Sequence, residues 1–462
     1  MLLALVAAAS LAADLEQVAR LPGEPSVVAA AGLTADDQPV LTLENTTAFD
    51  AGSTRRVVVR GPAAIEVARW MKTRAPAALR RQWMISVLPS ADGLDEASLG
   101  RWLTFQAVDL VVELQAADAH PIDTFRAALA RAPAGHSREH ETIAARVTRD
   151  PLAVAKLLAS QYPVTPSISY IPSIAWANTL TLSMIAGDAS LRTKVEQQMA
   201  PWRIEGKDLF GSRIQLTSVA GTFAFANLGS RDIVAKGVEA ASKVKDGDVY
   251  EYGQGWTDDM FMATVVLAPG GQNDLAVRML IAYASRLQRP DGVFSHAPNG
   301  PIAWGRGNGF AALGLSESLN AMSEHDPNRG ALLAIYRRQM DAVRRLQAPD
   351  GMWNEVLDEP GSYREESATA MLTTAMARGI RGGWLDRSFV PVVERAWRGV
   401  AAHVAKDGTV IDVCTSTGAG PTKRYYLDRA AVTGADDRGG AMALMAAMEI
   451  NALRHAPTVS AQ

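Results

Sequence analysis

A nine-residue pattern recurs in the C-terminal half of the chain and constrains the fold more than any other sequence feature. Arg286–Phe294 reads Arg-Leu-Gln-Arg-Pro-Asp-Gly-Val-Phe, and Arg345–Trp353 reads Arg-Leu-Gln-Ala-Pro-Asp-Gly-Met-Trp. A weaker copy covers Val404–Val410. The Asp-Gly pairs begin at positions 291, 350 and 407, so successive pairs are 59 and 57 residues apart. Each pair marks a tight turn at the end of a helical stretch.

A repeat of this length fits two helices with their loops, which is the αα-hairpin unit. Residues 170–456 have room for five or six such units. Helical hairpins in that number close most naturally into a ring whose loops line a pocket at one end. We therefore expect a mainly α protein, with an (α/α)6 toroid over residues 170–456 and a small α/β domain before it.

The preceding part of the chain predicts that smaller domain and a connector. Residues 20–130 alternate short apolar runs with helical patterns, which predicts a small α/β domain with a mostly parallel sheet; we expect this domain to be non-catalytic, for the reason given below. Residues 131–169 are rich in Arg, Ala and Leu and predict a helical connector. The expected strands and the helix of the α/β domain are Arg56–Val59, Met84–Leu88, Leu110–Leu114 and Pro62–Ala75.

The first 13 residues form an apolar run as long as the hydrophobic core of a signal peptide and too short to span a bilayer. Ser10 and Ala12 supply the small residues that a signal peptidase needs. We therefore expect a signal peptide over residues 1–13 and a periplasmic or secreted protein, with a buried N-terminal helix as the alternative. No other stretch approaches the ~18 uninterrupted apolar residues that a membrane span requires.

The charge balance argues against a nucleic-acid partner. The chain has 46 Lys and Arg against 49 Asp and Glu, a formal net charge of −3, whereas phosphate binding needs a concentrated basic surface. Cys414 is the single cysteine, which excludes an internal disulfide and a thiolate metal cluster. The ten Trp offer flat faces that suit sugar rings, although most Trp in any protein pack in the core.

Four segments of the C-terminal half share a common order and spacing with one group of known enzymes. They read WTDDMFM, WGRGNGF, YREESATA and DVCTSTG, at Trp256–Met262, Trp304–Phe310, Tyr363–Ala370 and Asp412–Gly418. Together they resemble the unsaturated glucuronyl and rhamnogalacturonyl hydrolases, glycoside hydrolase families 88 and 105, over about residues 170–456.

The resemblance implies an (α/α)6 barrel and an oligosaccharide substrate that a polysaccharide lyase has left with a 4,5-unsaturated uronic acid at its non-reducing end. In such enzymes an acid protonates C4 of the C4=C5 enol ether, water adds at C5, and the hemiketal collapses to release the remaining sugar. The resemblance implies no metal and no organic cofactor. The chemistry needs one carboxyl group that is protonated in a partly apolar site and then serves as a base.

The resemblance implies that Asp258 is the catalytic acid. At the start of a helix Asp258 can point into the mouth of the barrel, while Trp256 and Phe261 reduce the access of water and favour the neutral acid. The alternative is that Asp258 or Asp259 only caps the helix. Asp259 is expected to cap or to support the site from behind.

The resemblance also implies a set of substrate-binding residues. His296 is expected to bind the uronate ring or the attacking water, and Arg306 to bind the uronate carboxylate in a bidentate manner. For Arg306 a buried structural salt bridge is the alternative, and Asn308 could equally satisfy loop backbone groups. The full expected set is Trp256, His296, Trp304, Arg306 and Asn308. Glu366 and Ser367 are expected to begin a helix as a capping pair.

Two departures from the family pattern stand out. Asp436-Asp437-Arg438-Gly439 occurs where the family has Asp-x-His-Gly, so Arg438 could alter contacts or add an anion-binding group. No clear counterpart exists for a second pocket Asp, since Asp188 and Asp232 are both in loop-like contexts.

The α/β domain faintly resembles zinc carboxypeptidase-like (M14-type) domains, but it lacks the expected ligands. No His occurs before His120, and the spaced pair His136 and Glu139, with His140 beside it, lies in a polar helical stretch rather than after a strand. A degenerate domain without a zinc site is therefore expected.

Two other functions remain open from the sequence. An inverting glycosidase acting on saturated glucuronides would need a second carboxyl group about 6.5–9.5 Å from the first, and Glu355 or Glu366 are the candidates near the motifs. A catalytically inactive carbohydrate-binding protein is the other alternative, although a binding protein has no need of the acid. The sequence indicates neither the source polysaccharide nor the oligomeric state.

Overall fold

The structure is a computed structural model, and it describes residues 27–29, 40–45, 56–77, 79, 83–88, 108–115, 117–131, 138–359 and 362–456. The expected signal peptide and His136 lie outside these residues, and the side chains of Glu139 and His140 are likewise not described. None of the helices within the described ranges combines the length and the apolar character needed to cross a membrane.

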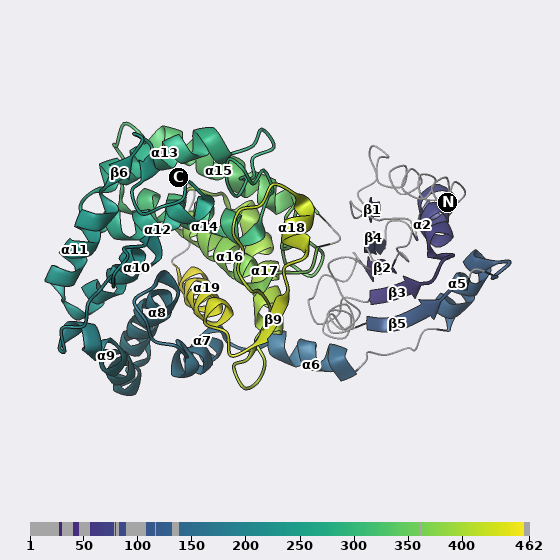
Figure 1. The fold of residues 1–462 in the computed structure, drawn as a ribbon. Helices are drawn as coiled ribbons and strands as arrows, with labels where there is room; N and C mark the ends of the chain where they lie inside the picture. The colour runs from purple at the N-terminus through teal and green to yellow at the C-terminus, as the bar shows by residue number, and fades with distance from the viewer. Residues whose placement is uncertain are drawn as a thin grey trace.

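The C-terminal part is a double ring of helices (Figure 1). Inner helices pack side by side in sequence, and α19 packs against α8, so that the last inner helix closes the ring on the first. The inner ring consists of α8 (Tyr170–Ala186), α10 (Leu216–Ala220) with the 3-10 helix η1 (Gly221–Leu228), α12 (Thr257–Leu267), α14 (Gly305–Ala321), α16 (Glu366–Arg381) and α19 (Asp437–His455). This is the expected (α/α)6 toroid.

The outer helices alternate with the inner ones along the chain. They are α7 (Pro151–Gln161), α9 (Ala189–Arg203), α11 (Arg231–Ala241), α13 (Asn273–Leu287), α15 (Arg329–Arg345) and α17 (Val390–His403). The two layers differ in sequence as their positions require. Nearly every residue of α12 is buried, whereas α15 buries one apolar face and exposes its arginines. A helix that is apolar on all sides needs neighbours on all sides, and the inner ring provides them.

The repeated Asp-Gly pairs form the same turn three times. Gly292, Gly351 and Gly408 have φ of 101°, 88° and 86°, a left-handed region that favours glycine. In each turn the glycine N–H donates to the carbonyl three residues earlier, and the Asp side chain accepts from the N–H two residues later. The turns follow α13, α15 and α17, so the sequence period marks the outer helices.

Each of these turns also rests on the next outer helix. A Cβ atom on Gly292 would lie 2.5 Å from the Arg338 carbonyl oxygen in α15, and one on Gly351 would lie 2.1 Å from the Arg395 carbonyl oxygen in α17. A Cβ on Gly408 would lie 2.1 Å from Gln161 Oε1 in α7. The repeat therefore provides close contacts between neighbouring hairpins, including the one that closes the ring.

Helix α7 belongs to this ring by its packing. It contacts α8 and α19, whereas the predicted boundary at residue 170 assigned it to the connector. Helix α6 (Arg138–Val147) packs on α17, and the arginines at its end cap that helix. Arg146 donates to the Ala402 carbonyl at 3.1 Å, and Arg149 donates to the Ala401 carbonyl at 2.7 Å.

The described part of the N-terminal unit contains one five-stranded sheet in the order β1-β4-β2-β3-β5. Pairs β1–β4 and β3–β5 are parallel, and pairs β2–β3 and β2–β4 are antiparallel, so the sheet is mixed rather than mostly parallel. Two strands were not expected: the edge strand β1 and the central strand β2, in which the apolar Leu41 and Leu43 alternate with polar residues. The strands are β1 (Val27–Ala29), β2 (Val40–Asn45), β3 (Arg56–Arg60), β4 (Trp83–Leu88) and β5 (Val108–Glu113).

Helices α2 (Ala64–Thr73) and α5 (Pro121–Ala130) pack on this sheet and on each other, with Phe125 in the shared core. Short elements complete the toroid loops: the two-stranded ribbons β6 (Val244–Lys245) with β7 (Val249–Tyr250) and β8 (Val410–Cys414) with β9 (Ala431–Gly434), the 3-10 helix η2 (Arg387–Phe389) and helix α18 (Lys423–Leu427).

Candidate active site

Charged and polar side chains gather where the inner helices begin. Asp258, Arg306, Ser367 and Arg438 are each the second residue of α12, α14, α16 and α19, and Tyr170 is the first residue of α8. Neighbouring inner helices run in the same direction, so these positions meet at one end of the toroid. The N–H groups of a helix's first turn carry partial positive charge, which makes this end favourable for an anionic ligand.

Asp258 and Asp259 are adjacent in α12 but have different environments. The side chain of Asp258 is 17% exposed, and its Oδ2 lies 3.2 Å from His296 Nε2 and 3.4 Å from Thr257 Oγ1. Neither partner is a backbone N–H of the helix, so these contacts are not those of a helix cap. Asp258 therefore keeps a partly exposed carboxyl group at the end of the ring where the inner helices begin.

Asp259 supports the loop before α12 from inside the protein. Its Oδ2 accepts hydrogen bonds from the Gln254 and Gly255 N–H groups at 2.9 and 2.7 Å and from the Tyr283 hydroxyl at 2.8 Å. Burial raises the pKa of Asp259 to about 6, while the Tyr283 hydrogen bond opposes this rise. The expected supporting role of Asp259 agrees with these contacts.

His296 is fully buried and joins Asp258 to a tyrosine. Its Nδ1 lies 2.8 Å from the Tyr426 hydroxyl oxygen, which also accepts a hydrogen bond from the Gly420 N–H at 3.2 Å. The backbone of His296 is fixed as well, because its carbonyl accepts from the Thr257 N–H at 3.0 Å. The imidazole is thus held at both nitrogens and through the main chain.

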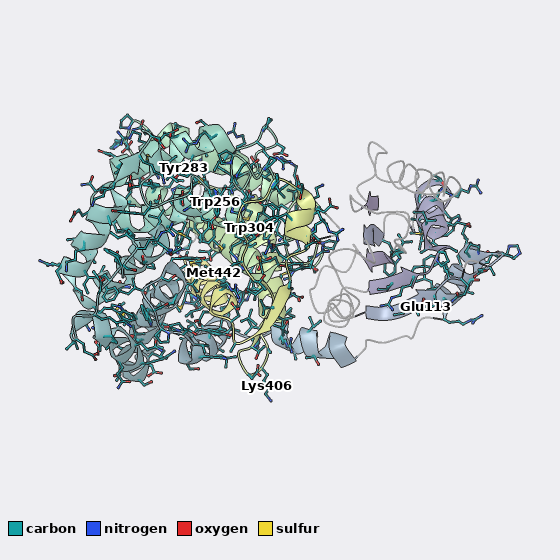
Figure 2. All side chains as sticks on the ribbon, in the orientation of Figure 1. Glu113, Trp256, Tyr283, Trp304, Lys406 and Met442 are labelled. Atoms are coloured by element: carbon teal, nitrogen blue, oxygen red, sulfur yellow. The ribbon has the colours of Figure 1, made fainter. Side chains whose placement is uncertain are left out.

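Two tryptophans enclose His296. Its ring centroid lies 4.5 Å from that of Trp304 and 5.2 Å from that of Trp256. Trp304 is buried and donates its Nε1–H to Glu355 Oε1 at 2.9 Å, whereas Trp256 is half-buried. Figure 2 shows Trp256 and Trp304 within the helical unit, so the apolar wall of the site comes from the toroid itself.

Arg306 is 2% exposed, and its donors already bind protein groups. Nε donates to Ser367 Oγ at 2.8 Å and Nη2 to the Cys414 carbonyl oxygen at 2.5 Å, while Glu365 Oε1 lies 3.7 Å from Nη2. These contacts fit the structural alternative considered for Arg306. The guanidinium places a positive charge beneath the site without presenting a free bidentate face.

Arg438 is the more exposed cation at this end of the ring. Its side chain is 24% exposed, pairs with both oxygens of Asp436 and donates from Nη1 to Ser416 Oγ at 3.1 Å. Arg306 Nη1 approaches the same hydroxyl at 3.5 Å. Ser416 has φ of 101°, a strained conformation for a residue with a side chain.

Asn308 is buried, and its amide binds backbone groups of the neighbouring loops. Its Oδ1 accepts from the Phe294 N–H at 2.8 Å, and its Nδ2 donates to the Phe294 and Trp304 carbonyls at 2.9 and 3.0 Å. These are the contacts of the alternative in which Asn308 satisfies loop groups. The loop that bears His296 is thereby tied to the start of α14.

Glu355 and Glu366, the candidates for a second carboxyl group, are both fully buried. Glu355 Oε1 accepts from Trp304 Nε1–H and from the Cys414 thiol at 3.0 Å, and burial, strengthened by nearby Glu365, raises its pKa to about 8. Burial also holds the pKa of Glu366 well above its ordinary value. The side chain of Glu365, not that of Glu366, accepts from the N–H groups that begin α16.

Tyr170 and Tyr426 were not assigned roles by the sequence. Tyr170 is 8% exposed, and burial raises the pKa of its phenol, which interacts electrostatically with Arg306, Asp258 and Arg438. The signal that marks Tyr170 is positional, since the residues at the start of every inner helix meet at this end. Asp188 and Asp232 lie at the starts of outer helices α9 and α11, away from the inner helix ends.

Comparisons with known proteins agree with this architecture. Residues 288–454 match the family model described as Glycosyl Hydrolase Family 88. A solved Clostridium acetobutylicum glycoside hydrolase from family 105 superposes with a TM-score of 0.58, covering 64% of this chain and 99% of that one at 19% identity. The helical unit has the fold of glycoside hydrolase family 105.

Two curated relatives are similar over shorter stretches. The unsaturated 3S-rhamnoglycuronyl hydrolase of Alteromonas sp. (strain LOR) is 31% identical over 113 residues, which cover 24% of this chain and 27% of the relative. The unsaturated rhamnogalacturonyl hydrolase YesR of Bacillus subtilis is 27% identical over 179 residues, covering 36% and 50%. This chain therefore spans between about a quarter and a half of the length of these relatives.

No group of three or more His, Cys, Asp or Glu side chains in the described part of the chain is arranged to hold a metal ion. The M14-type resemblance of the N-terminal unit stays a prediction, because His136 lies outside the described residues.

Proposed function

We propose that this protein is a glycoside hydrolase that removes a 4,5-unsaturated uronic acid from the non-reducing end of lyase-generated oligosaccharides. The observation that favours this function is the state of the carboxyl groups: Asp258 is accessible and held by His296, while Glu355 and Glu366 are sealed from solvent. One accessible acid beside aromatic walls suits protonation of an enol ether. The names of the two curated relatives support the same class of substrate.

In the proposed reaction Asp258 donates its proton to C4 of the sugar, and the electron pair of the C4=C5 bond forms the new C4–H bond. Water adds to the cation at C5, and the Asp258 carboxylate takes up the proton that this water releases. The C5 hemiketal then opens, and the remaining sugar leaves from C1. Trp256 offers a partly exposed face to the sugar ring, and Trp304 excludes water around His296.

An inverting glycosidase is less compatible with the site. That mechanism needs two carboxyl groups, about 6.5–9.5 Å apart, that both reach the space occupied by sugar and water. Glu355 and Glu366 are each 0% exposed, so neither faces such a space. An inactive binding protein is also less compatible, because the Asp258–His296 contact is built into the site.

The test is incubation with a panel of lyase-generated oligosaccharides while the ultraviolet absorbance of the enol ether is followed. We expect Asp258→Asn to lower kcat by at least ~10³-fold while substrate binding persists. Asp274→Asn is the matched control, since Asp274 is the second residue of outer helix α13 and is exposed. Cleavage of a saturated glucuronide with no loss of absorbance from any unsaturated substrate would contradict the proposal.

The uronate carboxylate is proposed to face Arg438 rather than Arg306, because Arg438 is accessible and Arg306 is not. We expect Arg438→Gln to raise KM about tenfold, the cost of one charged contact, with a smaller effect on kcat. Arg454→Gln is the control, because Arg454 forms a similar two-point ion pair with Glu394 at the other end of α19. Equal KM values for the two variants would exclude Arg438 from carboxylate binding.

We also propose a periplasmic or secreted location and a non-catalytic N-terminal unit. The location is supported by the apolar run of residues 1–13, and N-terminal sequencing of the protein recovered outside the cytoplasm would test cleavage near residue 13. An intact N-terminus on exported protein, or retention in the cytoplasm, would contradict the location. Loss of turnover on deletion of the N-terminal unit from a folded protein would contradict its non-catalytic role.

A further inference from the structure

The buried imidazole of His296 must satisfy both ring nitrogens inside the protein. Nδ1 faces the Tyr426 hydroxyl at 2.8 Å, and Nε2 faces Asp258 Oδ2 at 3.2 Å. A neutral imidazole has one N–H donor and one acceptor nitrogen, so its partners decide which nitrogen is protonated.

The surroundings of Tyr426 decide this choice. Tyr426 is fully buried, and its oxygen accepts a hydrogen bond from the Gly420 N–H at 3.2 Å. Its own O–H proton needs an acceptor, and within the described part of the chain His296 Nδ1 is the group that lies close enough to accept it. Protonation of Nδ1 would leave the buried O–H without an acceptor among the described residues, which is unfavourable for a buried donor.

We infer that Tyr426 is a positioning residue that fixes His296 in the tautomer protonated at Nε2. The Tyr426 hydroxyl donates to Nδ1, and Nε2–H donates to Asp258 Oδ2. Thr257 Oγ1 approaches the same oxygen at 3.4 Å, so both contacts to the Asp258 carboxyl converge on Oδ2.

The same contacts also decide which oxygen of Asp258 carries the transferred proton. Because Oδ2 accepts from His296 and is approached by Thr257, the proton that Asp258 transfers would be carried by the other oxygen, Oδ1. After transfer, Nε2–H stabilises the carboxylate without donating its own proton. This last step rests on the proposed function, whereas the tautomer assignment does not.

The test is nitrogen NMR of protein labelled with ¹⁵N-histidine, with the His296 signals assigned by their absence in His296→Gln. In the wild type we expect a protonated, pyrrole-type shift for Nε2 and an unprotonated, pyridine-type shift for Nδ1. In Tyr426→Phe the two shifts should move toward each other as both tautomers are populated. Tyr336→Phe is the matched control, because Tyr336 is buried in α15 and its hydroxyl donates to the Ala375 carbonyl at 2.7 Å.

Kinetics give a second readout. We expect Tyr426→Phe to lower kcat about tenfold and to shift its pH profile, with KM within about twofold, the pattern of a misplaced proton rather than lost binding. Tyr336→Phe should leave both constants within about twofold. A pyrrole-type Nδ1 in the wild type would overturn the inference even if the enzyme is active. The expected tautomer without any turnover would instead contradict only the proposed function.

Discussion

Glu355 shapes the site without facing it. Its carboxyl group is fully buried, accepts hydrogen bonds from Trp304 and Cys414, and has a pKa raised to about 8 by burial and by Glu365. Trp304 in turn packs 4.5 Å from His296, ring centroid to ring centroid. Glu355 therefore anchors Trp304, part of the apolar wall beside Asp258 and His296, from inside the protein.

This burial predicts a pH dependence of stability. Between the ordinary glutamate pKa and about 8 the folded protein binds a proton at Glu355 that the unfolded chain has lost. The contribution of this group therefore decreases as the pH rises through that range. We expect Glu355→Gln to lack this loss, so its unfolding free energy relative to wild type should increase from pH 5 to pH 8. Denaturant titrations at both pH values would measure it, and a constant difference would contradict the raised pKa.

The sequence predicts which residues form the site better than it predicts which of their side chains are buried. The motifs contain Asp258 and Trp304, the family resemblance adds His296, and the structure brings these three together. They do not show that Arg306 and Asn308 are occupied by protein partners. Burial at the start of an inner helix depends on loops more than 100 residues away, such as the Cys414 segment that covers Arg306. The sequence pattern of a single segment does not show which distant segments cover it.

The three Asp-Gly turns, which follow outer helices α13, α15 and α17, each contact the next outer helix in the ring. The sequence predicts these turns, because a repeated turn needs the same residues each time. The mixed N-terminal sheet was not predicted, since strand order and direction depend on pairing between distant segments. Strands β1 and β2 lie outside the strands expected from the sequence, although the apolar residues of β2 alternate with polar ones.

The turn at Gly351 provides a test of this connection. Gly351→Ala combines a left-handed φ of 88° with a Cβ only 2.1 Å from the Arg395 carbonyl oxygen. We expect it to lower the free energy of unfolding by at least about 3 kcal/mol. Gly383→Ala is the control, because Gly383 has φ of 69° and no atom within 4 Å of a Cβ, and should cost only about 1 kcal/mol. Equal losses in urea unfolding would show that the contact with α17 is unimportant.

The whole molecule depends on closure of the ring by α7. Helix α7 packs on α8 and α19, and the third Asp-Gly turn lies against it. The boundary predicted at residue 170 leaves α7 outside the ring because the third copy of the repeat is weak. The residues that contact this turn and the end of α17, Gln161 and Arg149, lie about 250 residues earlier in the chain.

Truncation tests this closure. We expect a chain beginning at residue 138 to fold with a cooperative thermal transition, because it keeps α6, α7 and the arginines that cap α17. A chain beginning at residue 170 should fail to fold cooperatively, since α19 and α8 would expose the surface that α7 covers. Circular dichroism melts of the two chains would measure the difference. A shorter chain as stable as the longer one would contradict the assignment of α7 to the ring.

The proposed function depends on Asp258 protonating a carbon–carbon double bond rather than the glycosidic oxygen. The most direct measurement compares an oxygen-linked and a sulfur-linked glycoside of the same unsaturated uronic acid, followed by the loss of enol-ether absorbance. Sulfur is protonated poorly, so cleavage at C1 would stop with the sulfur-linked substrate, whereas protonation at C4 would not. We expect absorbance loss from both substrates at rates within about tenfold of each other, and Asp258→Asn should abolish the loss from both. Turnover of the oxygen-linked substrate alone would contradict it.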